Sequence, residues 1–268
     1  MKLSDAIRLL EEAKIDSPLH DAREIFLRIG NFARNEILFC DPETSDEKVL
    51  SAVSRRQKRE PLQYIIGEVG FYKETYKVSK DCLIPREDTE ILVDYAVKNL
   101  PSGAHFIDIC TGSGCVAISA LKNTDNTTAT AIDISSSALK IAEENAIING
   151  VFERISFIEA DVFANRIDKK AYAVLSNPPY VTENAYTALE DEIYFEPKIA
   201  FVGGKDGLDF YKKILDDYKD SLDTNGFFAF EIGYDQADAI KALAIERGLT
   251  PEIIKDLSGN DRVAVIKP

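Results

Sequence analysis

The sequence predicts an α/β fold, a doubly wound parallel sheet preceded by a small helical bundle. Apolar runs of strand length alternate with amphipathic runs of helix length from about residue 104 onward. Polar or glycine-rich turns follow four of these apolar runs. The first 65 or so residues, by contrast, show only helical spacing of apolar side chains. These three observations place a sheet domain behind a helical one.

Length and composition are those of a globular protein. The 268 residues are 45% hydrophobic and 29% charged, enough for one large domain with a smaller one. Acidic residues interrupt the first apolar stretch, so we expect no signal peptide. No apolar run approaches the roughly 20 residues of a membrane helix. We therefore expect a cytoplasmic protein without a membrane span.

Residues that bind metals or form disulfides are few and scattered. The net charge is −14, and the part beyond Gly67 carries nearly all of it. Such a charge disfavours direct contact with nucleic acid. Without a C-x-x-C pair or clustered histidines, we expect no metal site and no disulfide framework. The residues concerned are Cys40, Cys82, Cys110, Cys115, His20 and His105.

Residues 1–67 are interpreted as a helical domain that binds a partner. Thr44 and Glu47 form a capping-box pattern at the start of its fourth helix. The basic run Arg55–Arg59 is interpreted as a solvated helix face, with a partner-binding patch as the alternative. The four helices are predicted at residues 3–13, 19–29, 35–39 and 44–58.

Residues 68–82 predict a β-hairpin or linker, and residues 83–268 the sheet domain. The last two strands are joined by a turn at 258–261 and form an antiparallel pair that brings the sheet to seven strands. In the final helix we expect Ile245 to be buried. Strands are predicted at 104–110, 129–133, 155–160, 171–176, 226–232, 251–256 and 262–266. Helices are predicted from Asp88 or Thr89 to 99, and at 115–121, 135–149, 208–221 and 235–247.

A glycine-rich turn follows the first strand and opens a helix. Gly112-Ser113-Gly114-Cys115-Val116-Ala117 fits the pattern G-x-G-x-x-[G/A], which alone is weak support. Asp133 ends the next strand, 19 residues past Gly114, the spacing at which an acid meets ribose hydroxyls. The pattern suits NAD or S-adenosylmethionine equally, because both contain adenosine.

The stretch Asn177-Pro178-Pro179-Tyr180 distinguishes between these cofactors. It follows the fourth strand, and its prolines exclude both sheet and helix. An amide oxygen and a prolyl-region carbonyl can accept the two hydrogens of a planar nitrogen, and Tyr180 can stack on the planar group. This favours methyl transfer to an amide or amine over hydride transfer. The alternatives to a methyltransferase site are a proline turn without function and a nucleoside-binding module that is not catalytic.

Together the motifs resemble the PrmC/HemK family, the protein-(glutamine-N5) methyltransferases of peptide chain release factors. The resemblance runs along nearly the whole chain and implies a Rossmann-like class I S-adenosylmethionine-dependent methyltransferase domain. The motifs occur in order as LIPREDTE, DICTGSGCVAI, AID, EAD, SNPPY, EPKIAFVGGKDGL, EIGYDQ and DLSGNDRVA.

The resemblance also implies roles for individual residues. Asn177, Pro178 and Tyr180 correspond to catalytic positions, and Leu83 with Pro179 joins them around the substrate amide. Two residues depart from the family pattern: Cys110 stands where glycine is common, and Val162 replaces an aromatic residue of some relatives. The implied cofactor-binding residues are Cys110, Thr111, Gly112, Ser113, Gly114, Asp133, Asp161, Val162 and Asn177.

The implied reaction moves a methyl group from S-adenosyl-L-methionine to a glutamine amide nitrogen in the Gly-Gly-Gln motif of a release factor. S-adenosyl-L-homocysteine is the product. The alternative is methylation of an exocyclic amine of DNA adenine or ribosomal RNA guanine, which the negative charge disfavours. We expect a monomer.

Overall fold

The computed structural model describes residues 1–164 and 169–268. The chain divides into two compact units. The first contains Met1–Glu68 and the short segment Glu190–Phe195. The second contains Val69–Leu189 and Glu196–Pro268. Thus the segment Glu190–Phe195 belongs to the helical unit although the sequence places it inside the sheet domain.

The helical unit packs its helices around one apolar core. Leu10, Ile25, Phe26 and Val53 are fully or almost fully buried in it. Its helices are α1 (Leu3–Glu12), α2 (Pro18–Arg28), α3 (Arg34–Phe39), α4 (Glu47–Gln57) and α5 (Leu62–Ile66), and a 3-10 helix covers Asp191–Phe195.

The predicted capping box of α4 is wrong. Asp46 is the N-cap, and its carboxylate accepts a hydrogen bond of 2.8 Å from the Lys48 N–H. Thr44 instead accepts the Asp46 N–H through its hydroxyl. A carboxylate adjacent to the helix start satisfies the free N–H groups and also suits the positive end of the helix dipole.

The basic run at the end of α4 is not the solvated face that we expected. Arg56 is buried and donates to Asp21 at 2.7 Å and to Glu192 at 3.0 Å. Arg59 pairs with the same Glu192, and Arg55 donates to Glu60. These arginines therefore hold the helical unit together, and Arg56 fixes the segment Glu190–Phe195 within it.

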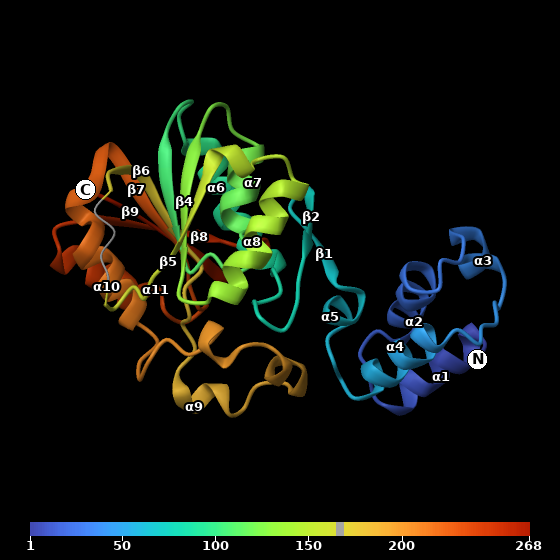
Figure 1. The fold of residues 1–268 in the computed structure, drawn as a ribbon. Helices are drawn as coiled ribbons and strands as arrows, with labels where there is room; N and C mark the ends of the chain where they lie inside the picture. The colour runs from blue at the N-terminus through green and yellow to red at the C-terminus, as the bar shows by residue number, and fades with distance from the viewer. Residues whose placement is uncertain (165–168) are drawn as a thin grey trace. The chain divides into compact units, whose positions relative to one another are not determined.

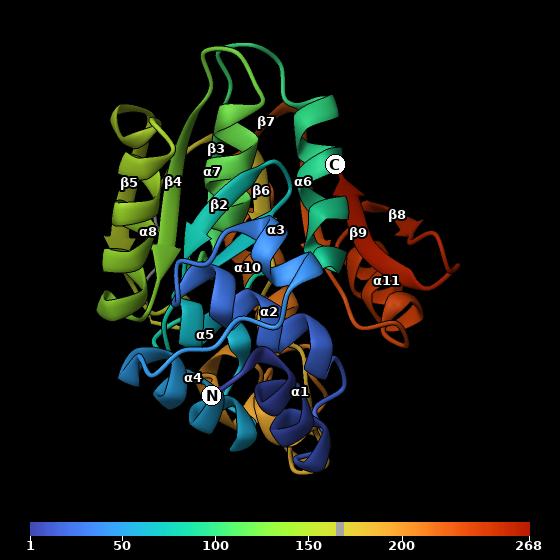
Figure 2. The same cartoon turned by 90° about the vertical axis from the view of Figure 1, so that its right-hand side faces the viewer.

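The second unit is built on a seven-stranded sheet in the order β5-β4-β3-β6-β7-β9-β8. The pairs among β5, β4, β3, β6 and β7 are parallel, while β9 runs antiparallel to β7 and β8. Figure 2 shows β5 and β8 at opposite edges. The strands are β3 (His105–Ile109), β4 (Thr128–Asp133), β5 (Ile155–Glu159), β6 (Ala171–Ser176), β7 (Leu222–Glu231), β8 (Thr250–Lys255) and β9 (Asp261–Lys267).

Helices cover both faces of this sheet (Figure 1). Alternate residues of a strand point to opposite faces, so Phe106 joins one apolar cluster and Ile107 the other. On the Phe106 face lie α6 (Glu90–Asn99), α7 (Cys115–Lys122) and α8 (Ser136–Ile148). On the other face lie α10 (Asp209–Tyr218) and α11 (Ala237–Glu246). The predicted doubly wound α/β architecture is confirmed.

Several short elements complete this unit. A two-stranded sheet joins β1 (Glu68–Phe71) to β2 (Glu74–Lys77). The remaining helix is α9 (Glu183–Tyr186), and 3-10 turns cover Glu87–Thr89, Phe152–Arg154, Lys198–Ala200 and Lys219–Ser221. The described part of the chain has no helix that is both long and apolar enough to cross a membrane.

The burial predicted for Ile245 is wrong, because its side chain is 65% exposed. Ala237, Ile240 and Ala244 form the buried stripe of α11. Ile245 follows Ala244 by one position, which turns its side chain by about 100° around the helix and away from the sheet.

Candidate active site

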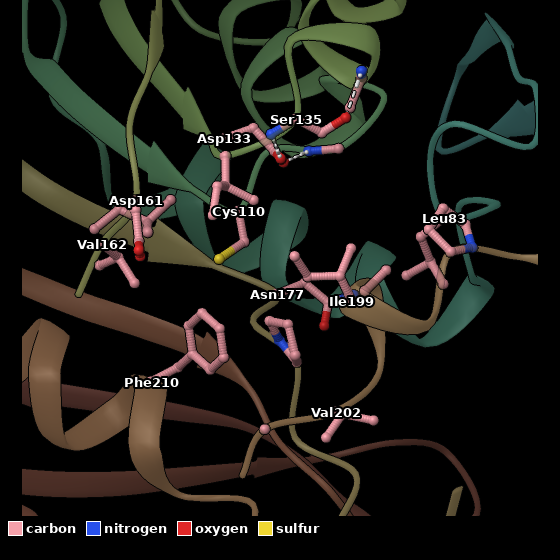
Figure 3. A pocket seen from close by; sticks show the side chains of 18 of the residues that line it. Leu83, Cys110, Asp133, Ser135, Asp161, Val162, Asn177, Ile199, Val202 and Phe210 are labelled. Atoms are coloured by element: carbon pink, nitrogen blue, oxygen red, sulfur yellow. Dashed lines mark hydrogen bonds between the residues drawn. The ribbon is translucent and has the colours of Figure 1, made fainter. Parts of the chain in front are cut away.

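A cavity of about 450 Å³ opens beyond the carboxyl ends of β3, β4, β5 and β6. In parallel α/β sheets this edge is where ligands bind. In Figure 3 Asp133 lies above the cavity, Phe210 below it and Leu83 at the right. The volume lies within the usual range of about 300–1,000 Å³ for small-molecule sites.

The glycine-rich turn after β3 forms one wall. Gly112 and Gly114 have φ angles of +55° and +82°, which favour glycine. A side chain at Gly114 would lie 2.8 Å from Ile118 Cδ1, so this glycine lets α7 pack closely. Gly112 has open space where a side chain would be, so a ligand can approach its backbone. Cys110, also with positive φ at +60°, places its side chain against the cavity.

Asp133 lies at the end of β4 and is held by backbone N–H groups. Its two oxygens accept from Gly112 at 2.8 Å and from Ser135 at 2.9 Å. Burial raises its pKa, while these hydrogen bonds oppose the rise. A carboxylate has about four acceptor positions, so Asp133 retains acceptor capacity beyond these backbone bonds. A ribose presents hydroxyl donors that suit this capacity.

The charges around the cavity distinguish the two adenosine cofactors. Among the described residues, the lining contains five acids and no lysine or arginine. A dinucleotide would bring two phosphates against this negative field, whereas S-adenosylmethionine is net positive, with a sulfonium and an ammonium group against one carboxylate. The residues therefore fit the sulfonium cofactor. The acids are Asp81, Asp133, Asp161, Glu183 and Asp209.

Aromatic and apolar side chains form the opposite wall. Phe163 and Phe210 both line the cavity, and their rings contact edge to face with centroids 4.8 Å apart. Val162, which is buried, lies beside them. The chain thus has aromatic groups for a flat base although Val162 itself is aliphatic.

Asn177 comes directly after β6 and also lines the cavity. Its Nδ2 donates to the Thr89 hydroxyl at 3.1 Å. Within residues 1–164 and 169–268, its Oδ1 has no hydrogen-bond donor. The carboxamide therefore has its nitrogen engaged and its oxygen available.

The backbone that follows Asn177 is held by the segment 201–207. The Val181 N–H donates to the Phe201 carbonyl at 2.8 Å, and the Gly203 N–H donates to the Val181 carbonyl at 2.9 Å. Gln236 Nε2 bridges the Tyr180 and Gly207 carbonyls. The segment that contains Gly203, Gly204 and Gly207 thus packs against the Asn-Pro-Pro-Tyr loop and fixes the position of its backbone.

Replacement of Gly203 by alanine is expected to displace this loop. The new Cβ would lie 2.3 Å from the Pro179 carbonyl oxygen, a backbone atom that has no rotamer to change. We expect a loss of about 1–3 kcal/mol in the free energy of unfolding, together with reduced turnover. Gly70→Ala is the control, because nothing lies within 4 Å of its added Cβ. Equal denaturant midpoints for the two variants would contradict the prediction.

The structure brings together most of the residues that the sequence singled out. Those that line the cavity are Leu83, Cys110, Gly112, Asp133, Asp161, Val162, Asn177 and Pro179. Those outside the lining are Thr111, Ser113, Gly114, Pro178 and Tyr180. The Tyr180 phenol donates to Glu231 at 3.3 Å, and its ring packs against the apolar cluster that contains Ile107. Its role in stacking stays a prediction.

Other residues of this region were not anticipated. Asp108 is buried in β3, accepts from the Thr111 hydroxyl at 2.6 Å, and has one oxygen without a partner among the described residues. Burial raises the pKa of Asp108 to about 7. Thr89, Glu231 and Phe210 were also missed. Asp108 and Glu231 could have been found from the sequence, because each is an acid inside an apolar run of strand length, where a buried acid needs a partner.

Comparison with known proteins places the chain in a family. The PrmC N-terminal domain model matches residues 2–67, and the methyltransferase small domain model matches residues 87–195. The solved ribosomal protein L11 methylase of Lactobacillus delbrueckii subsp. bulgaricus shares the fold, with a TM-score of 0.53, 20% identity, and coverage of 71% of this chain and 83% of that one.

Two curated relatives carry the same name. The release factor glutamine methyltransferase of Thermodesulfovibrio yellowstonii is 36% identical over 100% of this chain and 98% of its own. That of Caulobacter vibrioides is 36% identical over 96% of this chain and 91% of its own. The chain belongs to the release factor glutamine methyltransferase family.

Proposed function

We propose that this protein methylates the side-chain amide nitrogen, N5, of the glutamine in the Gly-Gly-Gln motif of peptide chain release factors. S-adenosyl-L-methionine is the methyl donor and S-adenosyl-L-homocysteine the product. The observation that carries the proposal is the Asn177 carboxamide, whose oxygen is free to accept an amide hydrogen beside a cavity suited to the cofactor.

The residues of the chain orient the reactants. The cofactor supplies a methyl group activated by a positively charged sulfur, so no strong base is required before transfer. Asp133 and the backbone at Gly112 hold the nucleoside, and Phe163 and Phe210 enclose its base. Asn177 Oδ1 and the Pro178 carbonyl accept the two amide hydrogens, which directs the nitrogen lone pair toward the methyl group. After transfer the nitrogen loses one proton to water.

The remaining features of the proposal concern the whole molecule. Residues 1–67 form the partner-binding domain, 68–82 the connecting hairpin, and 83–268 the methyltransferase domain. The protein acts as a cytoplasmic monomer without direct contact to nucleic acid. A net charge of −14 supports the last point.

The test is transfer of labelled methyl from S-adenosylmethionine to a purified release factor. A matched release factor with the Gly-Gly-Gln glutamine replaced by alanine serves as control. We expect label on the first protein and none on the second. Label on duplex DNA or ribosomal RNA in parallel reactions, with none on the release factor, would overturn the proposal in favour of an exocyclic-amine methyltransferase.

A further inference from the structure

A chain of hydrogen bonds leads from Asn177 into the interior of the sheet domain. Asn177 Nδ2 donates to the Thr89 hydroxyl at 3.1 Å, and the Thr89 hydroxyl donates to Glu231 Oε2. The other oxygen of Glu231 accepts from the Tyr180 phenol at 3.3 Å. Thr89 and Glu231 are both buried, and neither lines the cavity.

Thr89 ends the 3-10 turn Glu87–Thr89, which leads directly into α6. Its φ and ψ of −66° and −19° are helical, and the Glu90 N–H bonds the carbonyls of Glu87 and Asp88 in the turn. Among the described residues the Thr89 hydroxyl makes no capping bond and instead connects Asn177 to Glu231. The hydroxyl is therefore available to link these two side chains.

Ionised Glu231 determines the direction of each hydrogen bond that links it through Thr89 to Asn177. A carboxylate only accepts hydrogen bonds, so the single proton of the Thr89 hydroxyl must face Glu231. The lone pairs of Thr89 then face Asn177, which must present its NH₂ group to them. The other end of the carboxamide, Asn177 Oδ1, consequently faces the cavity. The opposite orientation would put a lone pair of Oδ1 against a lone pair of Thr89.

We propose that Thr89 and Glu231 are positioning residues that hold the Asn177 carboxamide with its oxygen toward the substrate. Resting on the proposed function, this explains how the site selects a substrate nitrogen that bears hydrogens: a donor meets Oδ1 favourably, whereas an acceptor meets it lone pair to lone pair. Neither residue touches the substrate, so both act through Asn177.

The constraint depends on the charge of Glu231. Burial raises the pKa of Glu231 to about 7, and the bonds from Thr89 and Tyr180 limit the rise. Asp88 before α6 raises this pKa further, and Arg262 on β9 lowers it. The other groups facing it are Cys115 at the start of α7 and Tyr211 on α10, which donates to the Glu231 carbonyl.

Protonation of Glu231 would release the constraint. The neutral acid can donate to Thr89, whose own proton is then free to bond Asn177 Oδ1, and the carboxamide can rotate its NH₂ group toward the cavity. Because the pKa is raised, the ionised and orienting form predominates above pH 7 and is lost as the pH falls through 7. The orientation should therefore be fixed at pH 8 and relaxed at pH 6.

The first test observes the carboxamide itself and needs no substrate. In protein labelled with ¹⁵N-asparagine, the Asn177 NH₂ signals are assigned from their absence in Asn177→Asp. We expect these signals to shift with an apparent pKa of about 7 in the wild type, and to be insensitive to pH from 6 to 8 in Glu231→Gln. Thr89→Val should move them, and Thr89→Ser should bring them back.

The second test measures steady-state methyl transfer with the same variants. Thr89→Val removes only the hydroxyl, and we expect kcat to fall roughly tenfold with KM for cofactor within twofold. Thr89→Ser should recover most of kcat. The wild type should lose about tenfold in kcat from pH 8 to pH 6, and Glu231→Gln should show a flat profile. Thr127→Val, which removes another buried hydroxyl just before β4, is the matched control.

The two tests separate this inference from the proposed function. The inference would be overturned, whatever the substrate, if the Asn177 NH₂ signals changed neither with pH nor on Thr89→Val or Glu231→Gln substitution. So would equal losses of kcat in Thr89→Val and Thr127→Val. If the signals respond as expected but no release factor accepts methyl, the positioning role holds and the proposed substrate is wrong.

Discussion

Replacement of Asn177 by alanine is expected to lower kcat by roughly 10²–10³-fold, the usual effect of removing one preorganised polar group from a reaction centre. The affinity for cofactor should stay within about twofold. Asn177 supplies a carboxamide oxygen that has no donor among the described residues, whereas Asp133 and the glycine-rich turn are proposed to hold the nucleoside part. Single-turnover methyl transfer and calorimetric binding of S-adenosylhomocysteine measure the two effects separately.

Asn99→Ala is a suitable control for this variant. Asn99 is an exposed amide at the end of α6, and within residues 1–164 and 169–268 its side chain bonds only the Tyr95 carbonyl. Its loss should leave turnover unchanged. A fall in cofactor affinity as large as the fall in kcat for Asn177→Ala would contradict the division of roles between Asn177 and Asp133.

Replacement of Asp133 by alanine is expected to raise the Kd for cofactor by roughly 10²-fold. The variant loses the acceptor for the ribose and leaves the Gly112 and Ser135 N–H groups without their partner. Each hydrogen bond between Asp133 and a ribose hydroxyl contributes on the order of 1–3 kcal/mol. The loss of two such bonds accounts for this factor in Kd. Binding calorimetry measures the Kd.

Two further variants guard against a folding defect in that experiment. Asp133→Asn keeps one acceptor oxygen and should give an intermediate Kd, and Asp125→Ala removes an exposed acid from the α7–β4 connection and should change nothing. Thermal unfolding without ligand shows whether the glycine turn itself is intact. An unchanged Kd in a folded Asp133→Ala variant would exclude this carboxylate as a cofactor ligand.

The strands and the residues at their carboxyl ends could be read from the chain because the signals are local. The run Ala171–Ser176 is apolar, and the prolines after Asn177 end it, so the sequence predicted β6 with its bounds. The same reasoning placed Gly112, Asp133 and Asn177 at one edge, since parallel strands bring their carboxyl ends together. Asp133 and Gly112 are directly hydrogen-bonded there.

Where two nearby side chains can make the same interaction, the local sequence pattern did not show which of them makes it. Thr44 and Asp46 both precede α4, and only the folded chain shows that Asp46 caps it. Arg56 could have been a solvated cation, but burial beside Asp21 and Glu192 makes it an internal ion pair. Whether a polar side chain finds a partner depends on what packs against it, and that partner is distant in sequence.

The sequence by itself determined the class of fold, the family and eight of the residues that line the cavity. Periodicity, turns and motifs are properties of neighbouring residues. Only the tertiary structure decided how Asn177 is oriented, because Thr89 lies 88 positions from Asn177 and 142 positions from Glu231. No spacing rule connects the residue before α6 to the end of β7. Close packing of α6 on the sheet brings them together, and a buried carboxylate then fixes the direction of each hydrogen bond.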